Sequence, residues 1–463
     1  MTEKMHTNEI KRGMRMLIVG MARSGIAAAE LAASLGIVPV INDLKTEDQF
    51  AGQLEGLKKL PVEWRLGMKA EEALPGCDAL LISPGVPIQS PVVRLARDMG
   101  IPVVGELEFA ARHKKCAMTA LTGTNGKTTT TSLLAHIFAS SGVHTVAAGN
   151  IGYPMSSAVR ETENGDRIVC EVSSFQLETT DAFHPAAAAV LNISEDHLNR
   201  HGTMENYMAL KRHIFDAQTE SDYAILNWDD AACRGMAQGL RGRVLYFSRL
   251  SELPEGAYVK DGVITLCVDG CVHDLCREED LIIPGPHNLE NALAAALLAY
   301  VSGVAATDIA RGLTTFTGVE HRIEFVREKD GVRYINDSKG SNCDSTEKAV
   351  LSMKKSTVLI LGGSDKGTGF DKLARLIAET KEICHCIVLG ETAEKIAKSL
   401  ADAGYLAVTK AHGMEEAVKT AALMAKSFPC GGNVLLSPAC ASFDMFRDYE
   451  ERGRVFKNIV NNL

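Results

Sequence analysis

The sequence has no excess of positive charge. Its formal net charge is -9, with 49 Lys and Arg against 58 Asp and Glu. General nucleic-acid binders and membrane-surface binders need a field that attracts phosphate groups, so this balance argues against both classes. A local basic site for a small phosphorylated ligand stays compatible with it.

Long apolar runs are missing as well. No run approaches the roughly 20 residues that a membrane helix needs, and the opening segment MTEKMHTNEIKR lacks the apolar core of a signal peptide. Internal repeats and low-complexity stretches are also absent. We therefore expect a cytoplasmic enzyme of ordinary globular composition.

Paired cysteines are absent, although the chain contains 12 cysteines. None of them forms a C-x-x-C pair, and Cys384 and Cys386 lie in the apolar run EICHCIVLG, which predicts a buried strand. Zinc sites and redox motifs use closely spaced cysteine pairs. We interpret these residues as reduced thiols of the core rather than as metal ligands.

Apolar, β-branched strands that alternate with helices predict an α/β fold along the whole chain. Three such series begin at MRMLIVG, at CAMTALTG and near VRYINDSKGS, and 463 residues are enough for three domains. We predict a Rossmann-like N-terminal domain (1–105), a central P-loop mononucleotide-binding domain with a parallel sheet (106–318) and a C-terminal Rossmann-like domain (319–463).

A shortened phosphate-binding loop opens the central series. Leu121 stands where the pattern G-x-x-x-x-G-K-[ST] has its first glycine, but the loop still connects an apolar strand to a helix. Its backbone N–H groups can point at one anion, Lys127 supplies a point charge, and the Thr128 hydroxyl can reach Mg²⁺. The candidate nucleotide-binding residues here are Gly123, Thr124, Asn125, Gly126, Lys127, Thr128 and Thr129.

Charged side chains follow the next strands. Glu171 ends the strand of RIVCEVSS, where a buried carboxylate is costly unless it is paired or binds a metal, so a Mg²⁺ ligand and a salt-bridge partner both stay open. His197 and His201 in SEDHLNRHG lack the glutamate of H-E-x-x-H, which argues against a zinc protease. Lys211 on the following helix, taken alone, is typical of a solvated surface lysine.

Taken in order, these motifs resemble those of the Mur ligases of peptidoglycan precursor synthesis. The shared motifs are TGTNGKT, GNIG, EVSS, SEDHLNRHG, YMALK, PGPHNLENALAA, EHRIE and NDSKGSN. The resemblance spans essentially the whole chain. It implies a ligase that uses ATP to phosphorylate a substrate carboxylate, which the amine of an amino acid then attacks, with two Mg²⁺ ions as cofactors.

The resemblance also implies roles for single residues of the central domain. The implied catalytic residues are Lys127, Asn150, His197 and Lys211, and the implied metal ligands are Thr128, Glu171, His197 and Lys211. Lys211 matches a lysine that the family carries as a carbamate. Carbamylation turns a cation into an anion, which suits a metal-facing position better than an ammonium group does.

Further ATP contacts are implied by later motifs. Asn288 and Asn291 lie three residues apart at the start of a helix, hence on one face, and taken alone they could be helix caps. The resemblance adds Arg322, Asp337 and Lys339 from the C-terminal domain, which would close over ATP. Such closure excludes water, which would otherwise hydrolyse an acyl phosphate.

The C-terminal segment LLSPACASFDMFRDYEERGRVF most resembles the family member that adds D-glutamate, and the D-N-P-R and H-H-P patterns of other members are absent. The implied D-glutamate contacts are Ser341, Lys366, Ser442, Phe443 and Tyr449. Ser341, Phe443 and Tyr449 stand where we expect threonine, leucine and phenylalanine, which keeps a hydroxyl and apolar walls. Lys366 could instead be an ordinary loop lysine.

The N-terminal domain is expected to bind the uridine nucleotide of the acceptor, UDP-N-acetylmuramoyl-L-alanine. Its first turn is not G-x-G-x-x-G, so a plain strand-to-helix turn is an equal alternative. Arg23 and Ser24 would meet the diphosphate at the helix start, while Asp43 and Gly85 would flank the uracil. Arg23 could also be purely structural. The candidate contacts to this substrate are Arg23, Ser24, Asp43, Gly85 and Asn150.

Two alternative functions stay open. A folylpolyglutamate synthase-like ligase shares the ATP loop but generally lacks the first nucleotide-binding domain. A nucleotide-switched binding protein would need neither a carbamylated Lys211 nor a pocket for two carboxylates. We expect a monomer whose partners are small molecules, without nucleic acid or membrane.

Overall fold

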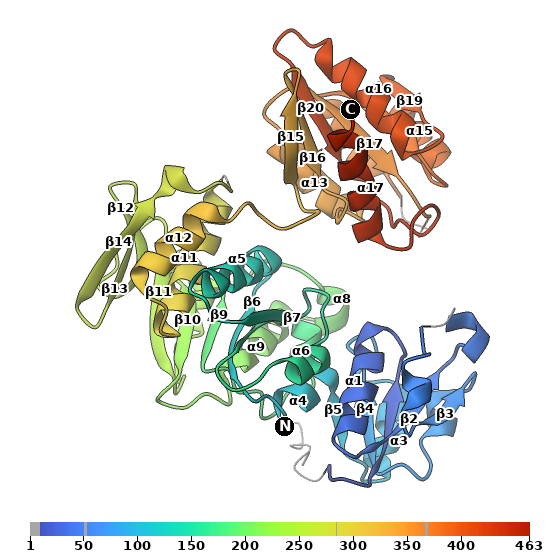
Figure 1. Cartoon of the computed structure of the whole chain (residues 1–463), viewed down its shortest axis with the longest axis vertical. Helices are drawn as coiled ribbons and strands as arrows, with labels where there is room; N and C mark the ends of the chain where they lie inside the picture. Colours follow the sequence, from blue (N-terminus) through green and yellow to red (C-terminus); the bar gives the residue numbers. More distant parts are fainter. Residues whose placement is uncertain (1–9, 51–52, 284, 366–368) are drawn as a thin grey trace. The chain divides into compact units, whose positions relative to one another are not determined.

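The computed structural model describes residues 10–50, 53–283, 285–365 and 369–463. The chain divides into two compact units, Met1–Phe316 and Thr317–Leu463. Each unit contains sheets of mainly parallel strands with helices between them (Figure 1), which confirms the predicted α/β class. Within the described ranges, no helix is both long and apolar enough to cross a membrane.

The first sheet of unit 1 is parallel, with five strands in the order β3-β2-β1-β4-β5. Its strands are β1 (Arg15–Val19), β2 (Val38–Asp43), β3 (Glu63–Leu66), β4 (Ala79–Ile82) and β5 (Val103–Gly105). The connecting helices are α1 (Arg23–Ser34), η2 (Glu47–Phe50), η3 (Leu57–Lys59), α2 (Ala70–Ala73) and α3 (Pro91–Asp98). Both faces of a parallel sheet are covered, so β1 buries Met16 and Leu17 in two different cores.

One of these two cores continues into the central sheet. Met16 of the first sheet belongs to the same hydrophobic cluster as Ala120 and Ile168 of the central one. Gly105, at the predicted first domain boundary, packs so closely on Thr179 that a Cβ would overlap its hydroxyl. The two sheets are therefore parts of one compact unit, and the division at residue 105 stays a prediction.

The central sheet has nine strands in the order β14-β13-β12-β11-β10-β9-β6-β8-β7. Its strands are β6 (Ala117–Thr122), β7 (Thr145–Gly149), β8 (Arg167–Glu171), β9 (Ala187–Val190), β10 (Tyr223–Asn227), β11 (Arg243–Ser248), β12 (Gly256–Lys260), β13 (Val263–Val268) and β14 (Cys271–Arg277). Its helices are α4 (Glu106–Ala111), α5 (Lys127–Ser140), α6 (Met155–Glu161), α7 (Ser174–Leu177), α8 (Leu198–His201), α9 (Met204–Arg212), η4 (His213–Phe215), α10 (Ala231–Gly235), η5 (Glu278–Asp280), α11 (Pro286–Val301) and α12 (Ala306–Thr315). Helices α5, α11 and α12 pack against one another beside this sheet (Figure 1).

The last three strands of this sheet run antiparallel to one another, which the prediction of a parallel sheet did not include. Each connection is an Asp-Gly pair with both residues at positive φ, Asp261 and Gly262 (49° and 76°) and Asp269 and Gly270 (54° and 72°). Two-residue hairpins require this left-handed conformation at both positions, and Asp-Gly adopts it readily. The sequence therefore contains a pattern that predicts both hairpins, in the segments KDGV and VDGC.

Unit 2 contains a six-stranded sheet in the order β15-β16-β20-β17-β18-β19, in which only β15 is antiparallel to its neighbour. Its strands are β15 (Glu324–Lys329), β16 (Val332–Asn336), β17 (Thr357–Gly362), β18 (Ile383–Leu389), β19 (Val408–Lys410) and β20 (Gly432–Leu436). Its helices are α13 (Cys343–Ser352), α14 (Asp371–Glu379), α15 (Ala393–Asp402), α16 (Met414–Lys426) and α17 (Tyr449–Asn461).

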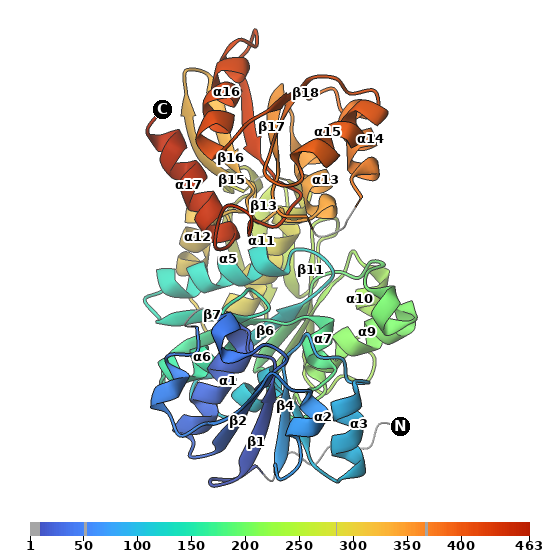
Figure 2. The same ribbon diagram turned by 90° about the vertical axis from the view of Figure 1, so that its right-hand side faces the viewer.

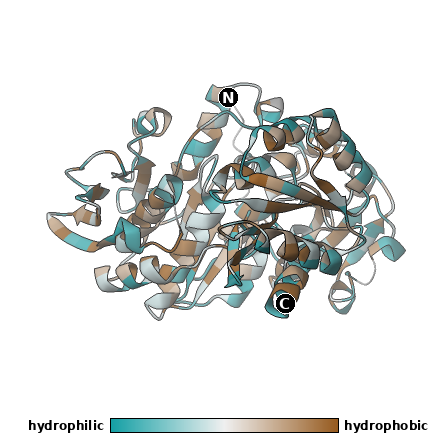
Figure 3. Ribbon diagram, turned by 90° about the horizontal axis from the view of Figure 1, so that it is seen from above, coloured by the Kyte–Doolittle hydropathy of each residue, from teal (hydrophilic) through white to brown (hydrophobic). Residues whose placement is uncertain are grey.

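Two hydrophobic cores cover the two faces of the unit 2 sheet. Val358 and Ile360 of β17 pack with α16 and α17, whereas Leu359 and Leu361 pack with α13, α14 and α15. Figure 2 shows these two groups of helices on opposite sides of the strands. In Figure 3, hydrophobic residues accordingly concentrate along the strands, and many loops are hydrophilic. The polar loops that follow the parallel strands lie at the carboxyl ends of those strands.

Candidate active site

Four neighbouring strands of the central sheet bring the predicted catalytic segments to one edge. β9, β6, β8 and β7 are parallel and adjacent, so their carboxyl ends lie together. Glu171 at the end of β8 is level with Leu121 of β6 and with Gly149 of β7. Ligands of open α/β sheets bind beyond such carboxyl ends, so this edge is where the predicted site can form.

The loop after β6 has the backbone geometry of a phosphate cradle. Gly126 lies in the left-handed region at φ +81°, and a Cβ at this position would overlap the amide oxygen of Asn291. Helix α5 starts at the next residue, Lys127. Its first turn, with Thr128 and Thr129, carries N–H groups that have no acceptor within the helix and can therefore meet an anion.

The remaining loop residues attach the cradle to the segment after β9. The backbone N–H of Thr124 donates to the carbonyl of Asn192 (2.9 Å), and that of Asn125 donates to the Asn192 side-chain oxygen (2.8 Å). The Thr124 hydroxyl is hydrogen-bonded to the hydroxyl of Tyr207 (3.2 Å). Tyr207 was not predicted as a site residue. Its signal in the sequence is the four-residue spacing to Lys211 on one helix face.

Two lysines converge on one carbonyl oxygen of this loop. Lys127 donates to the carbonyl of Gly123 at 2.8 Å, and Lys211 of α9 donates to the same oxygen, also at 2.8 Å. Lys211 is buried, unlike the surface lysine that its sequence context alone suggested. Burial and, second, the charge of Lys127 lower the pKa of Lys211 to about 7. Near neutral pH, Lys211 is thus an amine with a substantial neutral fraction.

Only one of the two carboxylate oxygens of Glu171 is hydrogen-bonded. Its side-chain oxygen Oε1 accepts a hydrogen bond from Nδ2 of Asn150 (2.8 Å), and its carbonyl accepts one from the Asn150 backbone N–H (2.8 Å). The second oxygen, Oε2, is buried and has no hydrogen-bond partner among the described residues. A buried carboxylate oxygen in this state fits a bound cation, since hard oxygen donors are the ligands that Mg²⁺ prefers.

His197 lies on a turn. Its backbone is left-handed (φ 52°), directly before α8, and 49% of its side chain is exposed. The ring packs on Phe175 of α7, with centroids 4.9 Å apart. No group of three or more His, Cys, Asp and Glu side chains close enough to hold a metal ion occurs among the residues that the structure describes. A metal there would need donors from the loop or from the substrates.

Asn288 and Asn291 lie at the start of α11, next to the phosphate loop. The Asn291 side chain accepts a hydrogen bond from the Thr130 hydroxyl of α5 (3.1 Å) and donates one to Asn288 (3.2 Å). Neither residue is the N-cap of the helix, which is Gly285. The pair therefore joins the starts of α5 and α11, within reach of Gly126.

The predicted uridine site falls at the point where strand order reverses in the first sheet. The chain leads from β1 outward to β3 on one side and, through β4, to β5 on the other. The turn after β1 carries Arg23 and Ser24 at the start of α1, and Gly85 lies in the turn after β4. Nucleotides bind at such switch points in doubly wound sheets.

Asp43 has a structural role in the same turn. Its carboxylate accepts hydrogen bonds from the backbone N–H groups of Met21 (2.8 Å) and Lys45 (3.0 Å). Ser83, which sequence reasoning missed, ties the two turns together by donating from its hydroxyl to the carbonyls of Val19 (3.0 Å) and Gly20 (3.2 Å). Its signal is the motif SPG, of which only the glycine was predicted.

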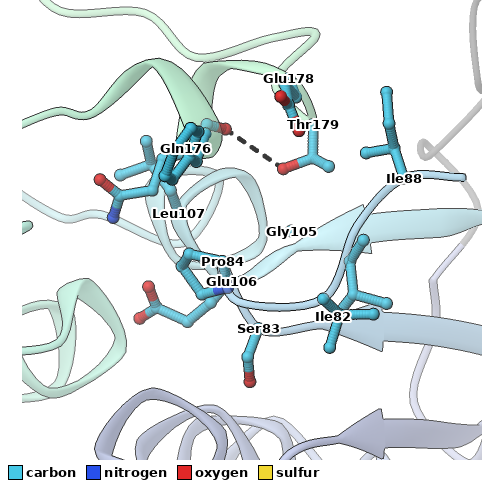
Figure 4. Close-up of a pocket in the computed structure, with 12 residues that line it drawn as sticks. Ile82, Ser83, Pro84, Ile88, Gly105, Glu106, Leu107, Gln176, Glu178 and Thr179 are labelled. Atoms are coloured by element: carbon cyan, nitrogen blue, oxygen red, sulfur yellow. Dashed lines mark hydrogen bonds between the residues drawn. The ribbon is translucent and has the colours of Figure 1, made fainter. Parts of the chain in front are cut away.

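A small pocket lies between the turn after β4 and helices α4 and α7 (Figure 4). Its lining residues are Ile82, Ser83, Pro84, Val86, Ile88, Gly105, Glu106, Leu107, Phe175, Gln176, Glu178 and Thr179. On the α7 side, the Thr179 hydroxyl donates to the carbonyl of Gln176 (3.2 Å), the bond drawn in Figure 4. The pocket lies between the switch point of the first sheet and α7, the helix that follows Glu171 in the chain.

In unit 2, the predicted ATP contacts surround the end of β16. Asp337 is buried and accepts hydrogen bonds from the Ser437 hydroxyl (2.6 Å) and from the backbone N–H of Ile323 (3.2 Å). Burial raises its pKa to about 7. Arg322 is exposed, while the backbone N–H of Lys339 donates to the carbonyl of His321 (2.9 Å). These bonds bring the EHRIE and NDSKG motifs together.

The predicted D-glutamate residues of unit 2 differ in exposure. Ser442 is buried and Ser341 is half-buried, whereas Phe443 is 71% exposed, and its role as a pocket wall stays a prediction. Tyr449 starts α17 and lies under the amine of Lys339, 5.8 Å from its ring centroid. Lys366 lies outside the described residues.

Arg452 is a buried residue that sequence reasoning missed. Its guanidinium donates to the carbonyls of Cys440 (3.0 Å), Ala441 (3.1 Å) and Ser338 (2.8 Å) and to the Ser338 hydroxyl (3.0 Å). It thereby joins α17 to the loops after β16 and β20, which carry the predicted D-glutamate contacts. No signal distinguishes it within FRDYEERGR, because the segment contains several charged residues of similar spacing.

Models of three Mur ligase domains match this chain. They are a MurD-like N-terminal domain over residues 14–105, the Mur ligase middle domain over 121–299 and the glutamate ligase domain over 321–440. Among curated proteins, the UDP-N-acetylmuramoylalanine--D-glutamate ligase of Thermoanaerobacter pseudethanolicus is 46% identical, covering 98% of this chain and 99% of its own. The enzyme of that name from Clostridioides difficile is 41% identical, with the same coverages.

Solved structures show a similar fold at lower identity. UDP-N-acetylmuramate-alanine ligase MurC from Thermotoga maritima has a TM-score of 0.59 at 18% identity, covering 97% of this chain and 99% of that chain. MurF from Acinetobacter baumannii has a TM-score of 0.58 at 18% identity, covering 97% and 93%. At this identity the similarity concerns the fold alone.

Proposed function

The chain belongs to the Mur ligase family, and we propose that it joins D-glutamate to UDP-N-acetylmuramoyl-L-alanine at the expense of ATP. The observation that carries this proposal is the near full-length similarity, at 46% identity, to a curated ligase of that name. Enzymes of this family depend on ATP and usually on Mg²⁺. The geometry of the central site supports the same chemistry.

ATP binding is proposed for the loop after β6. The left-handed Gly126 and the first turn of α5 offer backbone N–H groups to the phosphates. Lys127 presently donates to two carbonyls of its own loop, at 2.8 and 2.9 Å. We propose that it exchanges these neutral partners for phosphate oxygens, which form stronger, charge-assisted bonds.

The donors at the edge of the sheet fit a magnesium ion. We propose Glu171, through its unpartnered Oε2, and the hydroxyl of Thr128 as protein ligands, and we expect two ions in total. Bound magnesium supplies positive charge that screens the repulsion between the acceptor carboxylate and the triphosphate. Asn150 keeps Glu171 in place by its bond to Oε1.

Lys211 and His197 are proposed to face the acceptor carboxylate. The lowered pKa of Lys211, about 7, leaves a neutral amine that can attack carbon dioxide, forming a carbamate and releasing a proton. The carbamate carries negative charge and oxygen donors where an ammonium would repel a cation. His197 is open to solvent and therefore accessible to a substrate or an ion.

The proposed reaction has two steps. A carboxylate oxygen of the acceptor attacks the γ-phosphorus of ATP, and ADP leaves with the bonding electron pair. The amine of D-glutamate, after losing a proton, then attacks the acyl carbon, and the resulting tetrahedral species expels phosphate. We retain Ser341, Ser442, Phe443, Tyr449 and Lys366 as predicted contacts of D-glutamate, and Arg322, Asp337 and Lys339 as predicted contacts of ATP.

Phosphate release tests this function. The protein is incubated with ATP, Mg²⁺, UDP-N-acetylmuramoyl-L-alanine and a panel of amino acids, and we expect release that requires both the acceptor and D-glutamate. Release with a folate acceptor instead would support the folylpolyglutamate synthase-like alternative. Slow release that ignores both substrates would support a nucleotide-switched binding protein. We further propose a cytoplasmic location, since the reaction consumes ATP, and a monomeric state.

A further inference from the structure

A chain of ring contacts joins the two basic residues that we place near the acceptor carboxylate. We call it the ring chain: His197, Phe175, His201 and Tyr207, ending at the amine of Lys211. The ring centroids are 4.9 Å apart for His197 and Phe175, 5.4 Å for Phe175 and His201, and 5.4 Å for His201 and Tyr207. The amine nitrogen of Lys211 lies 4.6 Å from the centroid of Tyr207.

His201 is the middle ring, and polar contacts from α7 and its end hold it in place. Its Nε2 is hydrogen-bonded to the Ser174 hydroxyl (3.0 Å), and its Nδ1 lies 3.6 Å from the Glu178 carboxylate. Arg200 pairs with both oxygens of Glu178, at 3.0 and 2.6 Å, and stacks over the ring of Phe175. The imidazole is thus anchored to the segment that follows Glu171.

Tyr207 transmits this position to the phosphate loop. Its ring is stacked on His201 with an angle of 28° between the planes, and it is buried. Its hydroxyl meets that of Thr124, and its ring supports the Lys211 amine. A cation near a ring face is attracted electrostatically, and a stacked neighbour limits how far that ring can tilt.

We propose that His201 is a positioning residue, whose flat ring holds Tyr207 in place and thereby sets where the Lys211 amine sits over the Gly123 carbonyl. The positioning role itself does not depend on the proposed function. Its purpose does, because a carbamate on the Lys211 amine would act near the acceptor carboxylate only in a ligase of this kind. The flat ring of His201 determines the position of Tyr207, while the hydrogen bond to Ser174 determines how the His201 ring is oriented.

The experiment distinguishes the effect of a flat ring at position 201 from the effect of any side chain that fills the same space. His201→Phe and His201→Leu both lose the hydrogen bond to Ser174 and the polar contact with Glu178, but only phenylalanine keeps a flat ring against Tyr207. In protein labelled with ¹³C at the lysine Cε, the Lys211 signal is assigned by its loss in Lys211→Arg. We expect this signal to show the upfield ring-current shift in the wild type and in His201→Phe, and to lose it in His201→Leu.

Kinetics supply a second readout on the whole protein. We expect kcat to fall about tenfold in His201→Leu and to stay within about twofold in His201→Phe, with the KM for ATP unchanged in both. His273→Leu is the control, because His273 likewise combines a hydrogen bond to a hydroxyl (3.2 Å) with a tyrosine ring contact (5.5 Å), both from Tyr300, but lies on β14. It should move neither the Lys211 signal nor kcat.

The outcomes distinguish the proposal from the function on which it builds. An unchanged Lys211 signal in His201→Leu, or equal loss of the shift in both variants, would overturn the positioning role. If leucine does not give folded protein, His201→Gln, polar and without a ring, takes its place with the same expectation. A wild-type protein with the shifted Lys211 signal but no phosphate release from the two substrates would refute the ligase function and leave the positioning role standing.

Discussion

The buried charged side chains of the two units differ in how completely they are hydrogen-bonded. In unit 2, the guanidinium of Arg452 donates to three carbonyls and a hydroxyl, and both oxygens of Asp337 accept hydrogen bonds. In unit 1, Glu171 keeps a buried oxygen without a partner among the described residues, and two like-charged side chains, Lys211 and Lys127, donate to the same carbonyl, that of Gly123. The fully bonded groups of unit 2 hold loops together, and Asp337 is in addition a predicted contact of ATP. Buried charges that are incompletely bonded mark where a ligand is expected.

The largest effect is expected for Lys127. Lys127→Met should lower kcat at least about a thousandfold, or about 4 kcal/mol, because the charge that binds the transferring phosphoryl group is lost. The measurement is phosphate release that depends on D-glutamate. Lys398→Met, an exposed lysine on α15, is the control and should keep full activity. A Lys127 variant with more than a tenth of the wild-type kcat would contradict the proposed phosphate cradle.

The next effect concerns stability in unit 2. Arg452→Met should lower the free energy of unfolding by about 3 kcal/mol, because the buried carbonyls of Cys440 and Ser338 lose the guanidinium as donor, while that of Ala441 keeps the bond from the Ser364 N–H. Urea unfolding of the whole chain measures this. Arg447→Met is the control, since the Arg447 side chain is 80% exposed and should change stability by less than about 0.5 kcal/mol. Equal effects of the two substitutions would remove the contrast between the units.

For Glu171 we expect a substitution to lower activity rather than stability, the opposite of what we expect for Arg452. Glu171→Gln keeps an acceptor for Asn150 but removes the charge, so kcat should fall about a hundredfold and the Mg²⁺ concentration for half-maximal rate should rise. The melting temperature should not fall, because no satisfied charge is lost. Magnesium titrations of the rate, paired with thermal unfolding, measure both. A clear drop in melting temperature without a change in the magnesium requirement would make Glu171 a structural residue.

The last prediction concerns the pH dependence due to Lys211. Its pKa is about 7 in the folded chain and 10.5 as the ordinary value, so between these limits the unfolded state binds more protons. Stability relative to Lys211→Met should therefore rise with pH over this window, in buffer free of carbon dioxide. With limiting bicarbonate, kcat should also rise through about pH 7, as the neutral amine accumulates. A stability difference that is flat in pH would contradict the lowered pKa.

Motif order predicted much of the molecule. The strand, loop and helix around Lys127 were identified from local pattern, and the structure has β6, the loop and α5 there. The antiparallel hairpins of β12 to β14 were missed, although both Asp-Gly pairs that build them are legible in the sequence. The site residues themselves stay predictions. The structure gives the geometry of those that lie among the described residues.

Local chemistry along the chain was enough to predict the α/β class and the glycine-containing turn that leads from β6 into α5. These properties depend on residues within a few positions of one another. The burial of Lys211, its pKa and its place on the Gly123 carbonyl depend instead on segments 88 positions apart. Desolvation and hydrogen bonding are set by whichever groups pack nearby, and only the folded sheet brings those groups together.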